Sequence, residues 1–223
     1  MRTVTKELQE KITPQQALEI LKNGNKRFVQ NLKVNRNLLE QVNETRDGQW
    51  PIAVILSCID SRTSAELIFD QGLGDIFSIR IAGNIINDDI LGSMEFACGV
   101  ARSKFILVLG HKKCGAIKGA CDHVEMGHLS TLLDKINPAI QLETTTKENR
   151  HSGNAEFVEN VARINVKRSI EEILNRSTIL KEMAEEGKIG ICGGMYDVAT
   201  GEVEFYEETI TLNQAKKTEL MLV

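Results

Sequence analysis

The stretch PIAVILSCIDSR, residues 51–62, joins a continuous apolar run to a cysteine and two charged side chains. The run 52–56 is rich in β-branched residues and has no polar alternation, which is typical of a strand buried on both faces of a parallel sheet. It ends at Ser57-Cys58. The sequence therefore predicts a buried strand with Cys58 at its carboxyl end.

Further strands and helices alternate on both sides of this run. The predicted strands cover residues 52–56, 76–81, 105–109, 188–195 and 202–206, the last two as a hairpin or close pair. The predicted helices cover residues 13–30, 65–69, 90–101, 114–123, 129–142 and 155–174. Alternating strands and helices favour parallel pairing through right-handed crossovers. We expect an α/β fold with a central, mainly parallel sheet flanked by helices.

Composition narrows the class of protein. The chain has 223 residues, 42% of them hydrophobic and 26% charged, as in ordinary globular proteins. Its net charge is -4 and it has no basic block, which argues against a nucleic-acid partner. No apolar run approaches the roughly 20 residues of a membrane span, and the start lacks the apolar segment of a secretory signal. We therefore expect no membrane span and a cytoplasmic location.

Two short motifs follow predicted strands. Cys58 follows the first strand, and His111-Lys112-Lys113-Cys114 follows the strand 105–109. The carboxyl ends of parallel strands meet at one edge of a sheet, so two thiolates and an imidazole can converge there. Cys58, His111 and Cys114 suit Zn²⁺, with the fourth position left for water. Alternatively, each residue alone is a buried structural side chain. The joint occurrence of both motifs, with Asp60 and Arg62 beside the first, favours a zinc site.

The two motifs, C-x-D-x-R and then H-x-x-C, resemble those of the β-class carbonic anhydrases. Further segments resemble the same family: residues 70–77, 80–84, 92–96, 17–28 and 196–201. The resemblance implies a zinc-dependent carbonic anhydrase that interconverts CO₂ and bicarbonate by attack of zinc-bound hydroxide on CO₂. It also implies one zinc per chain, held by Cys58, His111 and Cys114, and a catalytic pair of Asp60 and Arg62. Zinc lowers the pKa of bound water towards neutrality, which fits that chemistry.

The resemblance also implies substrate-binding residues. Gln49 aligns with an amide that binds substrate or bicarbonate, although a loop glutamine is an equal alternative. Phe77, Ala82 and Phe96 align with the walls of an apolar CO₂ pocket, and Gly115 with a backbone N–H near the site. Ala82 and Phe96 depart from the valine and tyrosine common there. An ordinary core role is the alternative for both phenylalanines.

Assembly and domain limits follow from the same resemblance. It implies a homodimer or a dimer of dimers in which the N-terminal helices pack on the partner subunit. The amphipathic N-terminal segment agrees, because its apolar stripe must be buried somewhere. We expect one domain over residues 1–223, with a helical arm over 1–48 and a zinc-binding α/β core over 49–223.

Other readings stay open at this point. The same fold can serve a CS₂ or COS hydrolase, or a noncatalytic, zinc-stabilised protein that binds bicarbonate. Some family members bind zinc through the motif aspartate and carry a bicarbonate pocket; Arg80 and Tyr196 resemble that pocket, but Ile55 replaces its tryptophan. We therefore expect the open, water-bound form. Residues without a metal or partner pattern are expected to be structural or solvated: Cys98, Cys121, Cys192, His123, His128, His151, Lys112 and Lys113.

Overall fold

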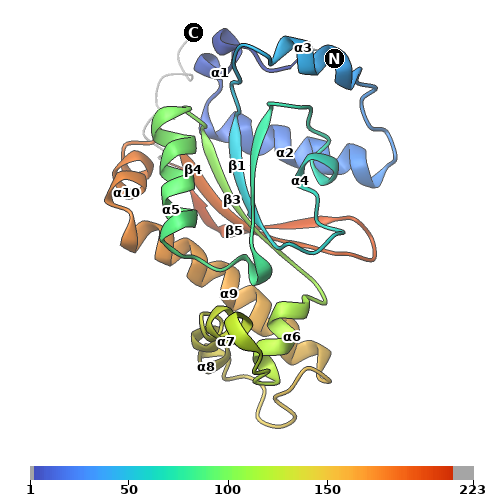
Figure 1. Cartoon of the computed structure of the whole chain (residues 1–223), viewed down its shortest axis with the longest axis vertical. Coiled ribbons are helices and arrows are strands. Elements are labelled where there is room, and N and C mark those ends of the chain that lie inside the picture. Colours follow the sequence, from blue (N-terminus) through green and yellow to red (C-terminus); the bar gives the residue numbers. More distant parts are fainter. Residues whose placement is uncertain (1–2, 213–223) are drawn as a thin grey trace, which may run out of the picture.

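A five-stranded sheet lies at the centre of the computed structural model, which describes residues 3–212 (Figure 1). Its strands are β1 (Ala53–Ser57), β2 (Ile76–Arg80), β3 (Phe105–His111), β4 (Gly190–Tyr196) and β5 (Val203–Thr211). They lie in the order β2-β1-β3-β4-β5, with the first four parallel and β5 antiparallel to β4. This confirms the predicted α/β fold and the terminal strand pair. The outer ends of the expected domain, 1–2 and 213–223, lie outside the described residues.

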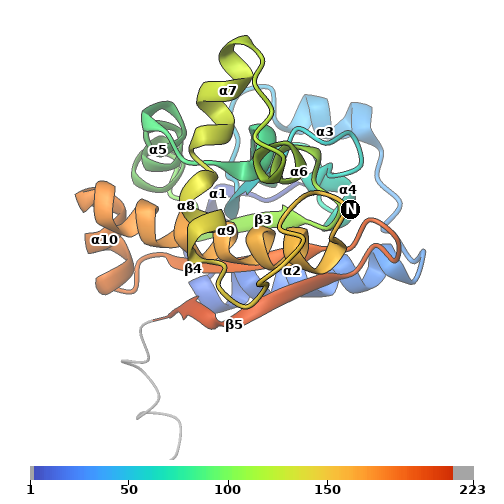
Figure 2. The same cartoon turned by 90° about the horizontal axis from the view of Figure 1, so that it is seen from below.

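The apolar run of β1 is explained by the helices that cover both faces of the sheet. Val54 and Leu56 belong to the core on one face, and Ala53 and Ile55 to the core on the other. Successive side chains of a strand point to opposite faces, so a strand covered on both sides needs no polar alternation. Figure 2 shows α2 on one side of the sheet and α5 and α6 on the other.

The helices differ from the sequence prediction mainly in number and length. They are α1 (Lys6–Lys11), α2 (Pro14–Val29), α3 (Leu38–Glu44), α4 (Ala65–Ile68), α5 (Asp88–Glu95), α6 (Gly115–Cys121), α7 (Gly127–Asp134), α8 (Asn137–Leu142), α9 (Ala155–Arg176) and α10 (Thr178–Glu185). The single helix predicted over 129–142 is two helices, with Pro138 in the first turn of α8. A proline is favoured there because the first turn needs no N–H donor from it.

Helix α2 is packed on the sheet of its own chain. Ala17, Leu18 and Leu21 are fully buried and share a core with β1 and β3. Gly24 permits a close approach to α4, because a Cβ there would lie 1.8 Å from the carbonyl oxygen of Phe69. The apolar stripe that was expected to need a partner subunit is therefore buried within the chain. The argument from this helix for packing on a partner is corrected accordingly.

The register of β1 and β3 brings the two sequence motifs together. Ser57 is aligned with Leu109 in the parallel pair, so Cys58 leaves β1 beside the last residues of β3. His111 is the final residue of β3, and Cys114 is the residue before α6. The sheet therefore places both motifs at one edge, the carboxyl end of its parallel strands, where open α/β sheets bind ligands.

Candidate metal and active site

The Sγ atoms of Cys58 and Cys114 and a ring nitrogen of His111 all lie within 4.8 Å of one another. The three residues are at most 4% exposed. The two sulfurs are 3.9 Å apart, and two sulfurs bound to one tetrahedral Zn²⁺ at about 2.3 Å would be about 3.8 Å apart. The spacing of the thiols therefore fits a zinc ion.

The polar chemistry of the cluster also fits a metal. His111 Nε2 is buried and has no hydrogen-bond partner among the described residues. A buried nitrogen without a partner is costly unless it binds something. The hydrogen bond with Cys114 is the main cause that holds the pKa of Cys58 well below its ordinary value, although burial opposes it. A thiol that ionises readily is suited to bind a cation.

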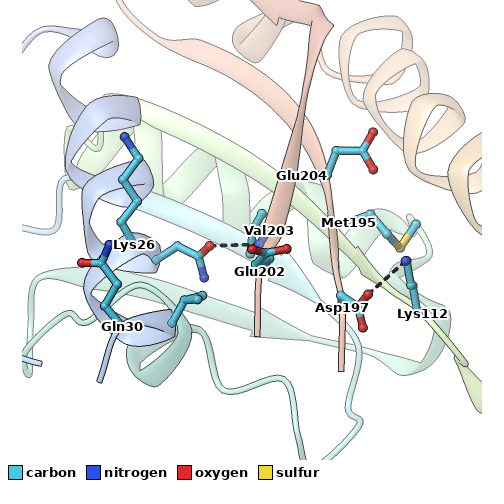
Figure 3. A pocket seen from close by; sticks show the side chains of 10 residues that line it. Lys26, Gln30, Lys112, Met195, Asp197, Glu202, Val203 and Glu204 are labelled. Atoms are coloured by element: carbon cyan, nitrogen blue, oxygen red, sulfur yellow. Dashed lines mark hydrogen bonds and ion pairs between the residues drawn. The ribbon is translucent and has the colours of Figure 1, made fainter. Parts of the chain in front are cut away.

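The ring of His111 is oriented by the peptide that follows it. Its Nδ1 lies 3.0 Å from the carbonyl oxygen of Lys112. Because a carbonyl oxygen can only accept, Nδ1 carries a proton, and Nε2 is the ring nitrogen left to bind a metal. Lys112 is itself held, since its Nζ lies 3.0 Å from Asp197 (Figure 3) and 3.7 Å from Glu159. Lys112 is therefore ion-paired and only partly exposed, and the expectation that it is solvated is corrected. Lys113 is exposed, as expected.

Asp60 and Arg62 form a bidentate pair beside the cluster. Arg62 Nε donates to Asp60 Oδ1 at 2.9 Å and its Nη2 donates to Oδ2 at 2.7 Å. The Arg62 backbone N–H also donates to Oδ1 at 3.0 Å. The hydrogen bonds from the Arg62 side chain are the largest cause that holds the pKa of Asp60 well below its usual range. Asp60 Oδ2 lies 3.9 Å from His111 Nε2, so an ionised carboxylate faces the cluster.

Two residues hold the loop that carries Cys58 and Asp60. Arg80 Nε donates to the carbonyl of Cys58 at 3.1 Å, and its Nη2 donates to the carbonyl of Asp60 at 2.6 Å. The buried hydroxyl of Thr63 lies 2.9 Å and 2.8 Å from the same two carbonyls. The sequence motifs do not indicate these supports. Arg80 was considered only as a member of a bicarbonate pocket, and a repeated carbonyl contact has no sequence signature.

The predicted pocket residues fall into two groups, since Phe77 and Phe96 lie at the sheet edge whereas Ala82 and Gly115 are sequence neighbours of residues at the cluster. Phe77 and Phe96 lie edge to face, with ring centroids 6.3 Å apart. Both line a cavity of about 650 Å³ between the edge strand β2 and α5, and 54% of Phe96 is exposed. Ala82 is partly buried in the turn after β2. Gly115 is exposed at the first residue of α6, next to Cys114.

Gln49 lies at the other end of β1. It is exposed, and it precedes β1 while Cys58 follows it. The five residues of β1 span about 16 Å at the rise of a strand. Gln49 therefore does not reach the Cys58 cluster of its own chain.

The remaining cysteines and histidines behave as structural or solvated groups. All five cysteines are free and buried. Burial is the largest cause that raises the pKa of Cys121 and Cys192 to about 11 and that of Cys98 to about 12. Each of these three thiols is thus kept protonated, in contrast with Cys58. The side chains of His123, His128 and His151 are exposed.

The fold and the thiol-imidazole cluster define an α/β protein with a metal site at the carboxyl edge of its sheet. The family model of the carbonic anhydrases matches residues 53–203. A carbonic anhydrase of Mycolicibacterium smegmatis is 35% identical over 198 residues, which cover 86% of this chain and 92% of the relative. Carbonic anhydrase 2 of Mycobacterium tuberculosis is 33% identical over 84% of this chain and 90% of the relative. The chain belongs to the β-carbonic anhydrase family, whose members are zinc enzymes that hydrate CO₂.

Solved structures agree with this assignment. The β-carbonic anhydrase CafA of Aspergillus fumigatus has a TM-score of 0.65 and 27% identity, over 76% of this chain and 81% of its own. A tetrameric β-carbonic anhydrase of Sordaria macrospora has a TM-score of 0.65 and 23% identity, over 75% of this chain and 90% of its own. The second likeness shows the shared fold alone. Among residues 3–212 we find no helix with the length and apolar character that a membrane span requires.

Proposed function

We propose that this chain catalyses the reversible hydration of CO₂ to bicarbonate and a proton, with one zinc ion held by Cys58, His111 and Cys114. The observation that carries the proposal is the buried cluster of two thiols with the unpartnered Nε2 of His111. When bound, zinc supplies a Lewis acid that lowers the pKa of water towards neutrality. The chain's own residues orient the reactants, place charge beside the metal and surround the site with apolar side chains.

Asp60 acts as the oriented acceptor at this site. Its carboxylate faces the cluster and is kept ionised by Arg62, so Oδ2 can accept a hydrogen bond from a water molecule there. Three hydrogen bonds from Arg62 occupy the carboxylate. This engagement favours the open form of the site, in which the fourth metal position is left to water.

A partner subunit completes the substrate pocket. Gln49 is too far from the cluster of its own chain, and Phe77 and Phe96 line an exposed cavity at the sheet edge. We therefore assign Gln49, Phe77 and Phe96 to the pocket of the neighbouring subunit, where Gln49 binds bicarbonate and the phenylalanines exclude water from CO₂. We assign Ala82, which follows β2, and Gly115, which follows Cys114, to the substrate pocket of their own chain.

The working unit is a homodimer, alone or in a dimer of dimers. On the N-terminal arm, the apolar side chains left exposed include Leu38, Leu39 and Val42 of α3, which are 52–78% exposed. We assign these, rather than the buried stripe of α2, to the partner contact. We infer that the arm (1–48) and the core (49–223) belong to a single domain, since within the described residues 3–212 helix α2 shares a core with the sheet. We place the protein in the cytoplasm, because five buried free thiols suit a reducing compartment.

Zinc analysis and CO₂ hydration kinetics on the same preparation test the proposal. We expect about one zinc per chain and rapid hydration, and little zinc in the Cys58→Ser, Cys114→Ser double variant. Cys98→Ser is the matched control, because this buried thiol lies outside the cluster and should leave the zinc content unchanged. Full zinc occupancy in the double variant would refute the ligand assignment. Turnover of CS₂ or COS but not CO₂ would refute the substrate.

A further inference from the structure

Helix α9 carries two buried polar residues on an otherwise apolar face. Asn165 and Ser169 are each 3% exposed. The other buried residues of α9 are Phe157, Val158, Val161, Ala162, Val166, Ile170 and Ile173. Asparagine is a poor helix former, and a buried amide is costly unless it is hydrogen-bonded. The two residues therefore call for an explanation that core packing does not supply.

Both residues bind the short turn after β2. Asn165 Nδ2 donates to the carbonyl of Gly83 at 2.9 Å. Ser169 Oγ lies 3.3 Å from the carbonyl of Asn84 and 2.9 Å from that of Asn165. The turn is Ala82–Asn84, and the two contacts join residues that are 82 and 85 positions apart in the sequence. Two consecutive carbonyls of one turn are thus held by two residues one helical turn apart.

The turn has a backbone that needs such support. Gly83 has φ +68° and Asn84 has φ +42°, both in the left-handed region. That conformation is unfavourable for a residue with a side chain, and it persists where the surroundings hold it. A Cβ at Gly83 would lie 2.8 Å from Ile136 Cδ1 and 3.3 Å from Ala116 Cβ, so the tight space and the positive φ both favour glycine there.

The conformation of this turn directs a backbone N–H at one thiol of the metal cluster. The N–H of Gly83 donates to Cys58 Sγ at 3.4 Å. A thiolate that accepts a backbone N–H has its charge stabilised and its lone pairs oriented, as supporting partners do for metal ligands in general. The path runs from Asn165 through Gly83 to Cys58. The carbonyl oxygen of Gly83 accepts from Asn165, and the N–H of Gly83 donates to Cys58 Sγ.

We propose that Asn165, assisted by Ser169, is a positioning residue for zinc binding: it holds the Ala82–Asn84 turn so that the Gly83 N–H remains directed at Cys58 Sγ. This inference rests on the proposed role of Cys58 as a zinc ligand. The role is specific to the metal site, because the residue that Asn165 holds, Gly83, donates its N–H to the thiol of Cys58.

The test compares Asn165→Ala with Asn160→Ala on the same helix. Asn160 Nδ2 makes long contacts of 3.4 and 3.5 Å with Thr145 and Glu143, away from the turn. Zinc affinity is measured by competition with a chelator, and the Co²⁺-substituted protein reports the thiolate-to-metal absorption band. Asn165→Ala should weaken zinc binding about 10- to 100-fold and shift that band. Asn160→Ala should leave both unchanged.

Further variants separate the possible outcomes. If Asn165→Ala does not fold, Ser169→Ala is measured in its place, and zinc binding weakened about threefold or more supports the proposal. Wild-type affinity and an unshifted band in a folded Asn165→Ala variant overturn the proposal, and the same result in Ser169→Ala overturns it where that variant is measured in its place. Cys58→Ser is measured in parallel. Wild-type zinc affinity in Cys58→Ser overturns the proposed ligand set. If zinc affinity is wild-type in Asn165→Ala but weakened in Cys58→Ser, only the positioning role of Asn165 is overturned.

Discussion

Asp60 illustrates how one neighbouring residue can keep a carboxylate beside the metal cluster ionised. Arg62 binds both of its oxygens and keeps it anionic beside the cluster. Asp60→Asn replaces the anion with an amide that cannot accept both guanidinium hydrogen bonds and that turns a donor towards the site. We expect the variant to keep its zinc while kcat for CO₂ hydration falls about 100-fold or more. Stopped-flow kinetics with metal analysis measure both quantities.

Asp122→Asn is the matched control for this variant. Asp122 is an exposed aspartate that accepts a hydrogen bond from the backbone of Ser152, at 2.8 Å. Asp122 is not part of the cluster, so the Asp122→Asn variant should hydrate CO₂ at the wild-type rate. An Asp60→Asn enzyme with full zinc and an unchanged rate would remove Asp60 from the mechanism.

Glu143 is a second carboxylate with a strongly altered environment. It is 2% exposed, and burial alone would raise its pKa. Hydrogen bonds from Thr145 and Thr146 and an ion pair with Arg150 at 2.6 Å outweigh burial and lower the pKa to about 2 from 4.5. The unfolded chain therefore takes up a proton at higher pH than the folded chain does. The stabilisation is complete above pH 4.5 and is lost as the pH falls towards 2.

Glu143→Gln tests this pH dependence. At about pH 7 we expect the variant to be less stable than the wild type by about 2 kcal/mol in free energy of unfolding. Urea unfolding at about pH 6 and about pH 3 should show the difference shrinking at the lower pH. Any acid loss of zinc affects both proteins, so the comparison removes it. A difference that stays constant with pH would show that Glu143 is not ionised with a lowered pKa.

The site residues that could be predicted from the sequence are those that lie within short sequence motifs. Cys58, Asp60 and Arg62 lie within five residues, and His111 and Cys114 follow an unmistakable buried strand. Arg80 and Asn165 were not predicted as supports, because each acts on the backbone of a distant segment. Asn165 meets Gly83 across 82 residues of sequence, and a single sequence carries no signal for such a contact. The role that we propose for Gln49 depends on a second chain, so one sequence does not reveal it either.

The elements that the sequence could predict are those with long or uniform patterns. The buried runs of β1 and β3 and the helices α2 and α9 have such patterns. Helices α1, α3 and α10 have six to eight residues, too few turns to show a clear period. The predicted helix 90–101 changes to π-helical geometry at Phe96–Val100, and side-chain periodicity cannot reveal that change.

The segment between α2 and α3 is fastened by one buried aspartate. Asp70 accepts hydrogen bonds from Arg27 Nε at 2.6 Å, from Arg36 Nη1 and from the backbone of Val34 at 3.2 Å. The Asp70 carboxylate is 2% exposed. Removing one partner of a buried ion pair leaves the other charge uncompensated. We expect Asp70→Asn to lower the free energy of unfolding by about 3 kcal/mol in denaturant titrations.

An exposed pair provides the comparison for Asp70. The side chains of Arg46 and Asp47 are 74% and 81% exposed and form an ion pair at 3.0 Å. Exposed pairs contribute about 0–1 kcal/mol. Asp47→Asn should therefore change stability little, and equal losses in the two variants would contradict the fastening role of Asp70.

At the scale of the whole molecule, the edge strand β2 leaves an apolar surface uncovered. Edge strands expose unpaired backbone groups that proteins normally cover. Here the edge carries Phe77 and the partly buried Ile79, and Phe96 extends the apolar surface. The metal cluster lies at the carboxyl end of the strands, whereas Gln49 lies at the other end. Pairing of two chains across this edge would cover the apolar surface and supply each site with the residues that its own chain lacks.

Phe96→Asp tests whether this surface makes the active assembly. A carboxylate at the centre of an apolar contact is costly to desolvate, so dimers should dissociate at concentrations where the wild type stays associated. Loss of the partner's residues should lower CO₂ hydration in parallel, while zinc content stays near one per chain. Sedimentation and activity measured across one dilution series check this coupling. Leu142→Asp, at another apolar residue that is 58% exposed, should alter neither. A fully active Phe96→Asp monomer would contradict both the dimer contact and the shared pocket.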